Sequence, residues 1–151
     1  MISTIGYERA SLADFVETLK LAEVDVLVDI RDRAQSRRKG FSKTALGQEL
    51  NANGINYVHF RQLGDPKAGR DAARAGNWKK FDRIYRAVLA TPDAQAAIRS
   101  LAEMAGTSHI CLLCYERDHR TCHRKYVSDD LEGRLDTKAM HLGVQPSRVA
   151  A

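Results

Sequence analysis

The segment DVLVDI, residues 25–30, decides which fold class this chain adopts. Its apolar side chains lack the alternation of a half-exposed strand, so we expect a strand that is covered on both faces. The segment SHICLLC, residues 108–114, has the same character and is the most apolar strand of the chain. Strands of this kind are typical of parallel sheets with helices on both faces, and they predict an α/β protein.

Further strands and helices alternate on both sides of these two segments. Strands are predicted at residues 2–6, 55–60 and 139–142, and helices at residues 12–22, 42–53, 92–105 and 122–133, with one more that begins at Asn77. Ser11 and Thr121 are the expected caps of two of these helices, while residues 61–76 are interpreted as a long glycine-rich connection. Trp78, Phe81 and Tyr85 stand at helical spacing and are predicted to face the core.

This alternation predicts the architecture. We expect a single domain over residues 1–145, with three α/β/α layers and a mainly parallel, doubly wound sheet of about five strands. Residues 146–151 are predicted to form a flexible tail.

The composition is that of an ordinary globular domain. Of 151 residues, 44% are hydrophobic and 28% are charged, which excludes a disordered or fibrous chain. No apolar run approaches the roughly 20 residues of a membrane-spanning helix, and the first residues do not resemble a secretory signal. We therefore expect a cytoplasmic protein without a membrane partner. The formal net charge of +5 permits an anionic partner but does not require one.

The carboxyl ends of the predicted strands carry most of the chemically active side chains. In a doubly wound sheet these ends meet at one edge, and ligands bind there. The residues expected to line one cleft there are Gly6, Arg31, Cys114, Glu116 and His123, and Tyr7 beside Gly6 is a predicted ligand-binding residue.

The three cysteines stand close together in the sequence, as Cys111, Cys114 and Cys122. In a chain without an export signal we interpret them as reduced thiols rather than as a disulfide framework. Cys114 ends a strand before a loop that leads into a helix, where main-chain N–H groups and the helix end lower the pKa of a thiol. It is a candidate nucleophile, and the alternative is a buried thiol without a chemical role. Cys111 is predicted to be core.

Cys114 also takes part in two other sequence patterns. Cys114 and Arg120 have the spacing of the cysteine phosphatase loop, and rhodaneses place a cysteine similarly. However, the intervening loop has no glycine and contains two carboxylates, which disfavour a bound phosphate dianion. Cys114, Cys122 and His123 are a conceivable zinc set, but the spacing lacks a Cys-x2-Cys knuckle. We therefore predict neither a metal nor another cofactor.

A strongly basic stretch, residues 31–43, follows the second strand and contains one acid, Asp32. Arg31 and Arg37 are predicted to hold a phosphate, with Ser36 beside them and the Phe41 ring available for stacking. The alternative is a solvated surface loop.

The chain resembles a known family, the domain-of-unknown-function family 488. The matching pieces are TIGY at residues 4–7, LVDIR at 27–31, SR at 36–37, GF at 40–41, GINYVH at 54–59, LG at 63–64, LLCYE at 112–116 and CHR at 122–124. The resemblance covers nearly the whole chain and implies a fold and a site, but not a reaction. Similar sequences often carry histidine where this chain has Tyr7, so a proton-transfer role at that position is not expected here.

Three function classes fit these residues. The leading hypothesis is an enzyme or recognition domain for a phosphate-bearing ligand, either a nucleotide or a nucleic acid. In it Glu116 is the acid/base or hydrogen-bond acceptor, Cys114 the nucleophile, and His123 and Arg124 orient them. The second is a non-catalytic module that senses nucleotides or nucleic acids, and the third is a rhodanese-like sulfur carrier.

Overall fold

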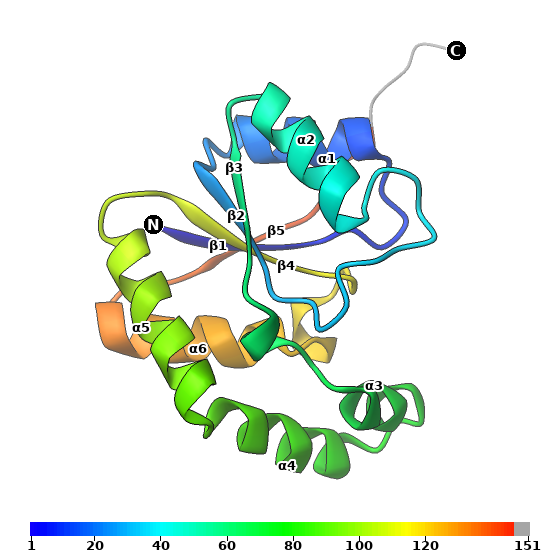
Figure 1. Cartoon of the computed structure of the whole chain (residues 1–151), viewed down its shortest axis with the longest axis vertical. Helices are drawn as coiled ribbons and strands as arrows, with labels where there is room; N and C mark the ends of the chain where they lie inside the picture. Colours follow the sequence, from blue (N-terminus) through cyan, green and yellow to red (C-terminus); the bar gives the residue numbers. More distant parts are fainter. Residues whose placement is uncertain (147–151) are drawn as a thin grey trace.

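A computed structural model describes residues 1–146 of the chain and has one five-stranded sheet (Figure 1). The strands are β1 (Ile2–Gly6), β2 (Val26–Asp29), β3 (Asn56–His59), β4 (Ile110–Cys114) and β5 (Met140–Leu142). Their order is β3-β2-β4-β1-β5, and every neighbouring pair is parallel. The predicted α/β fold class is confirmed. Most of the predicted tail, residues 147–151, lies outside the described residues, so the division at residue 145 stays a prediction.

Helices cover both faces of the sheet (Figure 1). Helices α1 (Leu12–Leu21) and α2 (Lys43–Ala52) pack on one face, where Leu27 of β2 points. Helices α5 (Pro92–Ala105) and α6 (Arg124–Leu135) pack on the other face, where Val26 and Val28 point. The apolar run in β2 therefore serves two separate cores, as a strand covered on both faces requires. None of the described helices combines the length and the hydropathy that a bilayer crossing needs.

The segment at residues 61–76 is more ordered than the sequence indicated. A 3₁₀ turn, η1 (Arg61–Leu63), leads into helix α3 (Lys67–Arg74), which packs beside α4 (Trp78–Leu89) beyond the edge of the sheet (Figure 1). The Asn77 side chain caps α4 by accepting a hydrogen bond from the Lys80 amide. Phe81 and Tyr85 are buried as predicted, but Trp78 is 46% exposed, because α4 begins away from the sheet.

Helix starts were predicted well at α1 and less well at α6. The Ser11 hydroxyl accepts a hydrogen bond from the Asp14 amide at 3.1 Å, as the capping pattern requires. Thr121 does not cap α6: it ends a second 3₁₀ turn, η2 (His119–Thr121), and donates its hydroxyl hydrogen bond to the Asp118 carbonyl. Cys122 and His123 consequently lie before the helix, in the turn that faces the end of β4.

The strand order creates a switch point between β2 and β4. From β2 the chain crosses to β3 through α2, and from β4 it crosses to β5 through α6, on the other face and in the opposite direction. Loops that leave neighbouring strands in opposite directions leave a gap between them, at the carboxyl edge. The register pairs Gly6 with Cys114 and Asp29 with Leu113, so the ends of β1, β2 and β4 are level there.

Candidate functional site

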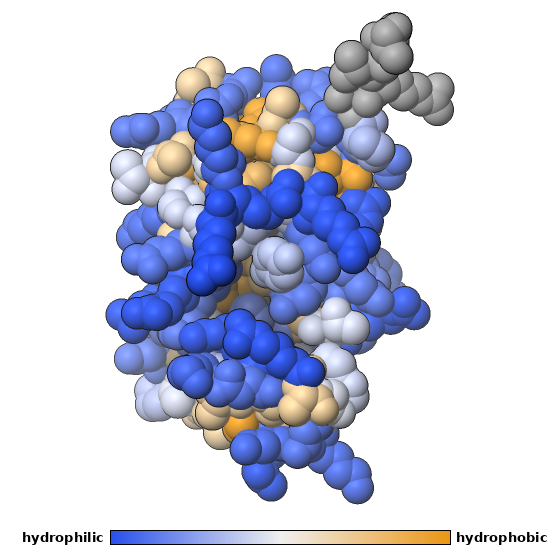
Figure 2. Space-filling model, turned by 90° about the vertical axis from the view of Figure 1, so that its right-hand side faces the viewer, coloured by the Kyte–Doolittle hydropathy of each residue, from blue (hydrophilic) through white to orange (hydrophobic). Residues whose placement is uncertain are grey.

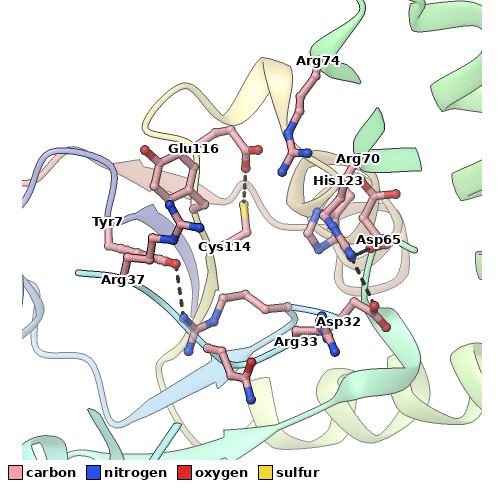
Figure 3. A pocket seen from close by; sticks show the side chains of 13 residues that line it. Tyr7, Asp32, Arg33, Arg37, Asp65, Arg70, Arg74, Cys114, Glu116 and His123 are labelled. Carbon is pink, nitrogen blue, oxygen red and sulfur yellow. Dashed lines mark hydrogen bonds and ion pairs between the residues drawn. The ribbon is translucent and has the colours of Figure 1, made fainter. Parts of the chain in front are cut away.

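A cavity of about 610 Å³ opens at the carboxyl ends of β1, β2 and β4 (Figure 3). Its walls come from the loop after β2, from α3 and from the loop after β4. The lining residues are Tyr7, Arg31, Asp32, Arg33, Gln35, Arg37, Asp65, Arg70, Arg74, Cys114, Tyr115, Glu116 and His123. Five arginines thus face three carboxylates, which gives the cavity a net positive charge. Figure 2 looks onto this side of the molecule, where strongly hydrophilic side chains border a hollow.

The structure brings together six of the residues that the sequence singled out. Tyr7, Arg31 and Arg37 line the cavity together with Cys114, Glu116 and His123. The remaining predicted site residues, Gly6, Ser36, Phe41 and Arg124, do not line it.

Gly6 positions the cavity wall rather than a ligand. A Cβ atom at this position would overlap the main-chain carbonyl of Glu116. Only a residue without a side chain allows the loop after β4 to come this close to the end of β1. The Ser36 amide donates a hydrogen bond to the Ser42 hydroxyl at 3.0 Å, so Ser36 likewise shapes its loop.

Phe41 is buried, and the stacking role predicted for its ring is wrong. The ring stacks on Tyr7 at a centroid distance of 4.7 Å, and the Phe15 ring packs edge-on against it. These apolar neighbours, distant in sequence, leave no ring face for a ligand. The aromatic ring that the cavity offers instead belongs to Tyr115, which is 45% exposed and lies edge-on to Tyr7.

Arg31 is a structural clamp in the cavity wall. Its Nε and Nη2 atoms donate hydrogen bonds to the two carboxylate oxygens of Asp29, at 2.9 and 2.7 Å. Its Nη1 donates to the Phe41 carbonyl and to the Tyr7 hydroxyl, at 2.7 and 3.3 Å. Burial alone would lower the pKa of Arg31, but the bonds to Asp29 raise it. Since four donor interactions are already made within the chain, Arg31 fixes the loop after β2 and is poorly placed to hold a ligand as predicted.

Arg33 and Arg37 are the guanidinium groups free to meet a ligand. Both are exposed, and within residues 1–146 neither has a hydrogen-bond or ion-pair partner. Arg70 is held by Asp32 at 3.1 Å and by a main-chain carbonyl, while Arg74 lies 3.7 Å from an exposed carboxylate on its own helix. The free positive charge of the cavity is therefore concentrated on the loop after β2.

Two carboxyl groups in the cavity have raised pKa values. Burial raises the pKa of Asp65 to about 7, with Arg70 opposing the rise and Glu116 adding to it. One Asp65 oxygen, Oδ1, is buried without a hydrogen-bond partner among the described residues, and Gly69 leaves the space that it occupies. Burial also raises the pKa of Glu116, against the effect of Arg124. Asp65, with a pKa of about 7, exchanges its proton readily near neutral pH, as acid/base chemistry requires.

The sulfur atoms of Cys114 and Cys122 lie within bonding distance of each other at the floor of the cavity. The prediction of reduced thiols stays a prediction for this pair, because the 7.3 Å between the two Cα atoms exceeds the usual span of a disulfide. The loop of residues 115–121 folds back through η2, so the turn before α6 presents Cys122 to the end of β4. Cys111 is free and fully buried, as predicted, and burial raises the pKa of its thiol.

Arg124 lies behind Cys114 and is fully buried. Its Nη1 atom lies 3.1 Å from the Cys114 sulfur and also donates to the Glu116 carbonyl, while Nη2 donates to the Arg117 carbonyl at 3.0 Å. Its Nε donates to the Thr4 hydroxyl at 3.1 Å. Within residues 1–146 no carboxylate forms an ion pair with it. Burial lowers the pKa of Arg124 to about 10, which leaves it charged at neutral pH.

His123 has a defined tautomer. Its Nε2 lies 2.7 Å from the Ile30 carbonyl, and because a carbonyl only accepts, Nε2 carries the proton. The lone pair of Nδ1 therefore faces the Cys122 sulfur, 3.7 Å away. Burial lowers the pKa of His123 to about 4, so the ring is neutral.

Cys114, Cys122 and His123 also form the one group in the described part of the chain whose ligand atoms, all within 4.8 Å of one another, suit a metal ion.

Sequence reasoning missed Asp65, Arg70, Arg74 and Tyr115. The first three belong to residues 61–76, for which the sequence predicts a long glycine-rich connection. Pro66 before α3, with Arg70 and Arg74 four residues apart, is a pattern that indicates a helix with two arginines on one face. This pattern is the sequence signal from which α3 and its two arginines could have been predicted.

These features define a class: parallel α/β domains with an arginine-lined cavity and a cysteine pair at the switch point of the sheet. A family model described as "Domain of unknown function DUF488" matches residues 11–131, and the chain belongs to this family. The resemblance read from the sequence is thereby confirmed. Neither the curated proteins nor the solved structures include a match to this chain.

Proposed function

We propose that the cavity binds a phosphate-bearing ligand of nucleotide size. The observation that carries this proposal is the convergence of five arginines on one cavity, two of which, Arg33 and Arg37, have no partner among the described residues. Planar guanidinium groups bind phosphate oxygens through paired, charge-assisted hydrogen bonds. A cavity of about 610 Å³ lies within the range of small-ligand sites.

A nucleotide fits the other lining residues better than a free phosphate does. The exposed Tyr115 ring stands at the rim and offers a surface on which a base stacks. Asp65 carries the orphan oxygen Oδ1, which accepts a hydrogen bond from a ribose hydroxyl or a base amine. A concave site of this size holds one nucleotide unit, whereas an extended nucleic acid needs a groove that follows its backbone.

Glu116 is the group that we propose for acid/base chemistry on the bound ligand. Its carboxyl lines the cavity, and its raised pKa keeps part of it protonated closer to neutral pH than a solvated glutamate. If the protein is an enzyme that converts its bound ligand, Glu116→Gln is expected to abolish turnover and to leave the affinity for the ligand nearly unchanged. A non-catalytic sensing module would show affinity without turnover in both proteins.

The test is a binding titration by calorimetry with adenosine and guanosine mono-, di- and triphosphates, inorganic phosphate and a short single-stranded oligonucleotide. Each lost guanidinium–phosphate contact costs about 1.5 kcal/mol or more, so Arg33→Ala with Arg37→Ala is expected to weaken nucleotide binding about a hundredfold. The matched control, Lys20→Ala with Arg99→Ala, removes the same charge from exposed positions outside the cavity lining and is expected to change affinity little.

Two results would overturn the proposal. In one, the wild type binds none of these phosphates at 50 mM salt, where the attraction between charges is only weakly screened. The other is an equal loss of affinity in the two double variants, which would indicate net charge rather than a site. Binding of the oligonucleotide alone would replace the nucleotide by nucleic acid as the ligand.

A further inference from the structure

We infer that Cys114 and Cys122 are a redox-active pair, in which Cys114 is the attacking thiolate and Cys122 the resolving thiol in exchange with small disulfides. The assignment rests on the groups around each sulfur atom, and it does not depend on which anion occupies the cavity.

Arg124 distinguishes Cys114 from Cys122. A buried cation without an anionic partner is costly, and Arg124 has no carboxylate partner within the described residues. The atom closest to supplying a negative charge is the Cys114 sulfur, 3.1 Å from Nη1. The Glu116 carboxyl also acts on Arg124, and its Oε2 lies 3.6 Å from the Cys114 sulfur, but burial raises its pKa and favours its neutral form. In the reduced protein a thiolate at Cys114 is therefore the closest anionic partner for Arg124. Arg124 therefore favours the reactive form of this cysteine over its neutral thiol.

Cys122 has different neighbours. Its sulfur faces the Nδ1 lone pair of His123 at 3.7 Å and accepts from the Arg124 amide at 3.5 Å. Since the Ile30 carbonyl fixes the other ring nitrogen as the protonated one, Nδ1 accepts the Cys122 S–H and directs the sulfur. Cys122 is thus held as a neutral thiol beside a thiolate, the arrangement of a resolving cysteine.

The exchange balances in two steps. The Cys114 thiolate attacks one sulfur of the small disulfide, an S–S bond forms to Cys114, the original S–S bond breaks, and one small thiolate leaves. The Cys122 sulfur then attacks the Cys114 sulfur, the mixed disulfide breaks, and the second small sulfur leaves with the proton of Cys122. The cysteine pair loses two electrons, and the small disulfide is reduced to one thiolate and one thiol.

Both sulfurs border open space although they are buried. Cys114 lines the arginine-lined cavity, and Cys122 lines a neighbouring cavity of about 240 Å³ beside Trp78. Glu116 and His123 line both cavities, so the two cavities adjoin each other. The exposed fractions are only 1% for Cys114 and 3% for Cys122, which admits small reagents and excludes protein partners.

A metal ion is the competing use of these residues, because the same two sulfurs and Nδ1 are ligand atoms. The Arg124 guanidinium disfavours it: a cation already contacts the Cys114 sulfur, and a divalent ion would add like charge at the same buried place. The two uses make different predictions for the reduced protein, so one experiment separates them.

The experiment exposes the reduced full chain to hydroxyethyl disulfide and measures the reaction of each cysteine over time. This reagent is uncharged, so its access does not depend on the arginines of the cavity. Peptide mass spectrometry after alkylation identifies the state of each cysteine. The wild type is expected to form the Cys114–Cys122 disulfide without a lasting adduct. Cys122→Ser is expected to accumulate a mixed disulfide on Cys114, at least ten times faster than Cys114→Ser accumulates one on Cys122. Cys111→Ala is the control and is expected to behave as the wild type.

Arg124→Met is expected to slow the reaction of Cys114 at pH 7 at least tenfold. Because that variant removes a buried anchor and could fail to fold, the comparison of Cys122→Ser with Cys114→Ser is the deciding one. The inference is overturned if Cys122→Ser forms no adduct on Cys114, or if Cys122 reacts faster than Cys114. It is also overturned if the reduced wild type binds stoichiometric Zn²⁺ that protects both cysteines and if His123→Ala abolishes that protection. None of these results bears on nucleotide binding, which the titration above tests separately.

Discussion

The Nη1 atom of Arg124 lies 3.1 Å from the sulfur of Cys114, at the buried floor of the cavity. One guanidinium group thereby ties the first turn of α6 to β1 through Thr4 and to the loop after β4 through two main-chain carbonyls. Buried carbonyls seldom lack partners, so this side chain is a structural requirement of the loop as well as a neighbour of the thiol.

Replacing Arg124 is therefore expected to reduce stability strongly. Arg124→Met leaves the carbonyls of Glu116 and Arg117 without donors, and we expect the free energy of unfolding to fall by about 3 kcal/mol. Urea unfolding followed by circular dichroism measures the change. The control is Arg120→Met, since Arg120 is an exposed partner of Asp118, and its unfolding midpoint is expected to stay near that of the wild type. A stable Arg124→Met protein would show that the loop does not need this anchor.

Gly6→Ala is expected to displace the loop that carries Glu116. The added methyl group meets main-chain atoms of Glu116 and Arg117, which cannot swing away as a side chain does. We expect a loss of about 1–3 kcal/mol in the free energy of unfolding, together with weaker nucleotide binding, because the cavity wall moves.

The matched control for this substitution is Gly133→Ala in α6. A Cβ atom there meets no heavy atom within 4 Å, and alanine favours a helix over glycine by about 0.5–1 kcal/mol. The control should therefore be slightly more stable than the wild type. Equal unfolding midpoints for the two alanine variants would contradict the close approach at Gly6.

Asp65 is expected to make the protein less stable as the pH rises. Its pKa in the folded chain is about 7, above the ordinary value of 3.8, so the folded state keeps a proton that the unfolded state has lost. Its stabilising contribution is complete below pH 3.8 and is lost as the pH rises through about 7. The slope is at most about 1.4 kcal/mol per pH unit for one such group.

Thermal unfolding of Asp65→Asn between pH 5 and pH 8 checks this. The neutral amide does not titrate, so the variant is expected to gain stability over the wild type up to about pH 7 and to keep a nearly constant advantage above it. Asp71→Asn is the control: Lys67 lowers the pKa of that exposed carboxyl, and the variant is expected to gain nothing as the pH rises. A stability difference between Asp65→Asn and the wild type that does not change with pH would show that Asp65 is ionised throughout.

The sequence by itself determined the fold class, because strand character is local. The apolar runs in β2 and β4 require cover on both faces, and the helices between the strands supply it. Parallel strands send their carboxyl ends to one edge, so Tyr7, Arg31 and Cys114 were correctly expected to meet. That expectation needed no knowledge of any side-chain contact.

Only the tertiary structure decided which of these side chains are available to a ligand. Arg31 is occupied by Asp29, and Phe41 is covered by Tyr7 and Phe15, although each looked free in a basic loop. Burial depends on what packs against a residue, and here the partners of Phe41 come from about 25–35 positions earlier in the chain.

The contacts at the floor of the cavity also depend on which elements pack against each other. Cys122 and Arg124 were expected at the start of a helix, where sequence spacing says nothing about what lies opposite. The turn before α6 places the sulfur of Cys122 against that of Cys114 and places Arg124 beside them as a buried cation. Apolar periodicity determines where strands and helices form. The pairing of polar side chains is decided only when these elements pack, because it depends on distances between residues that are far apart in the sequence.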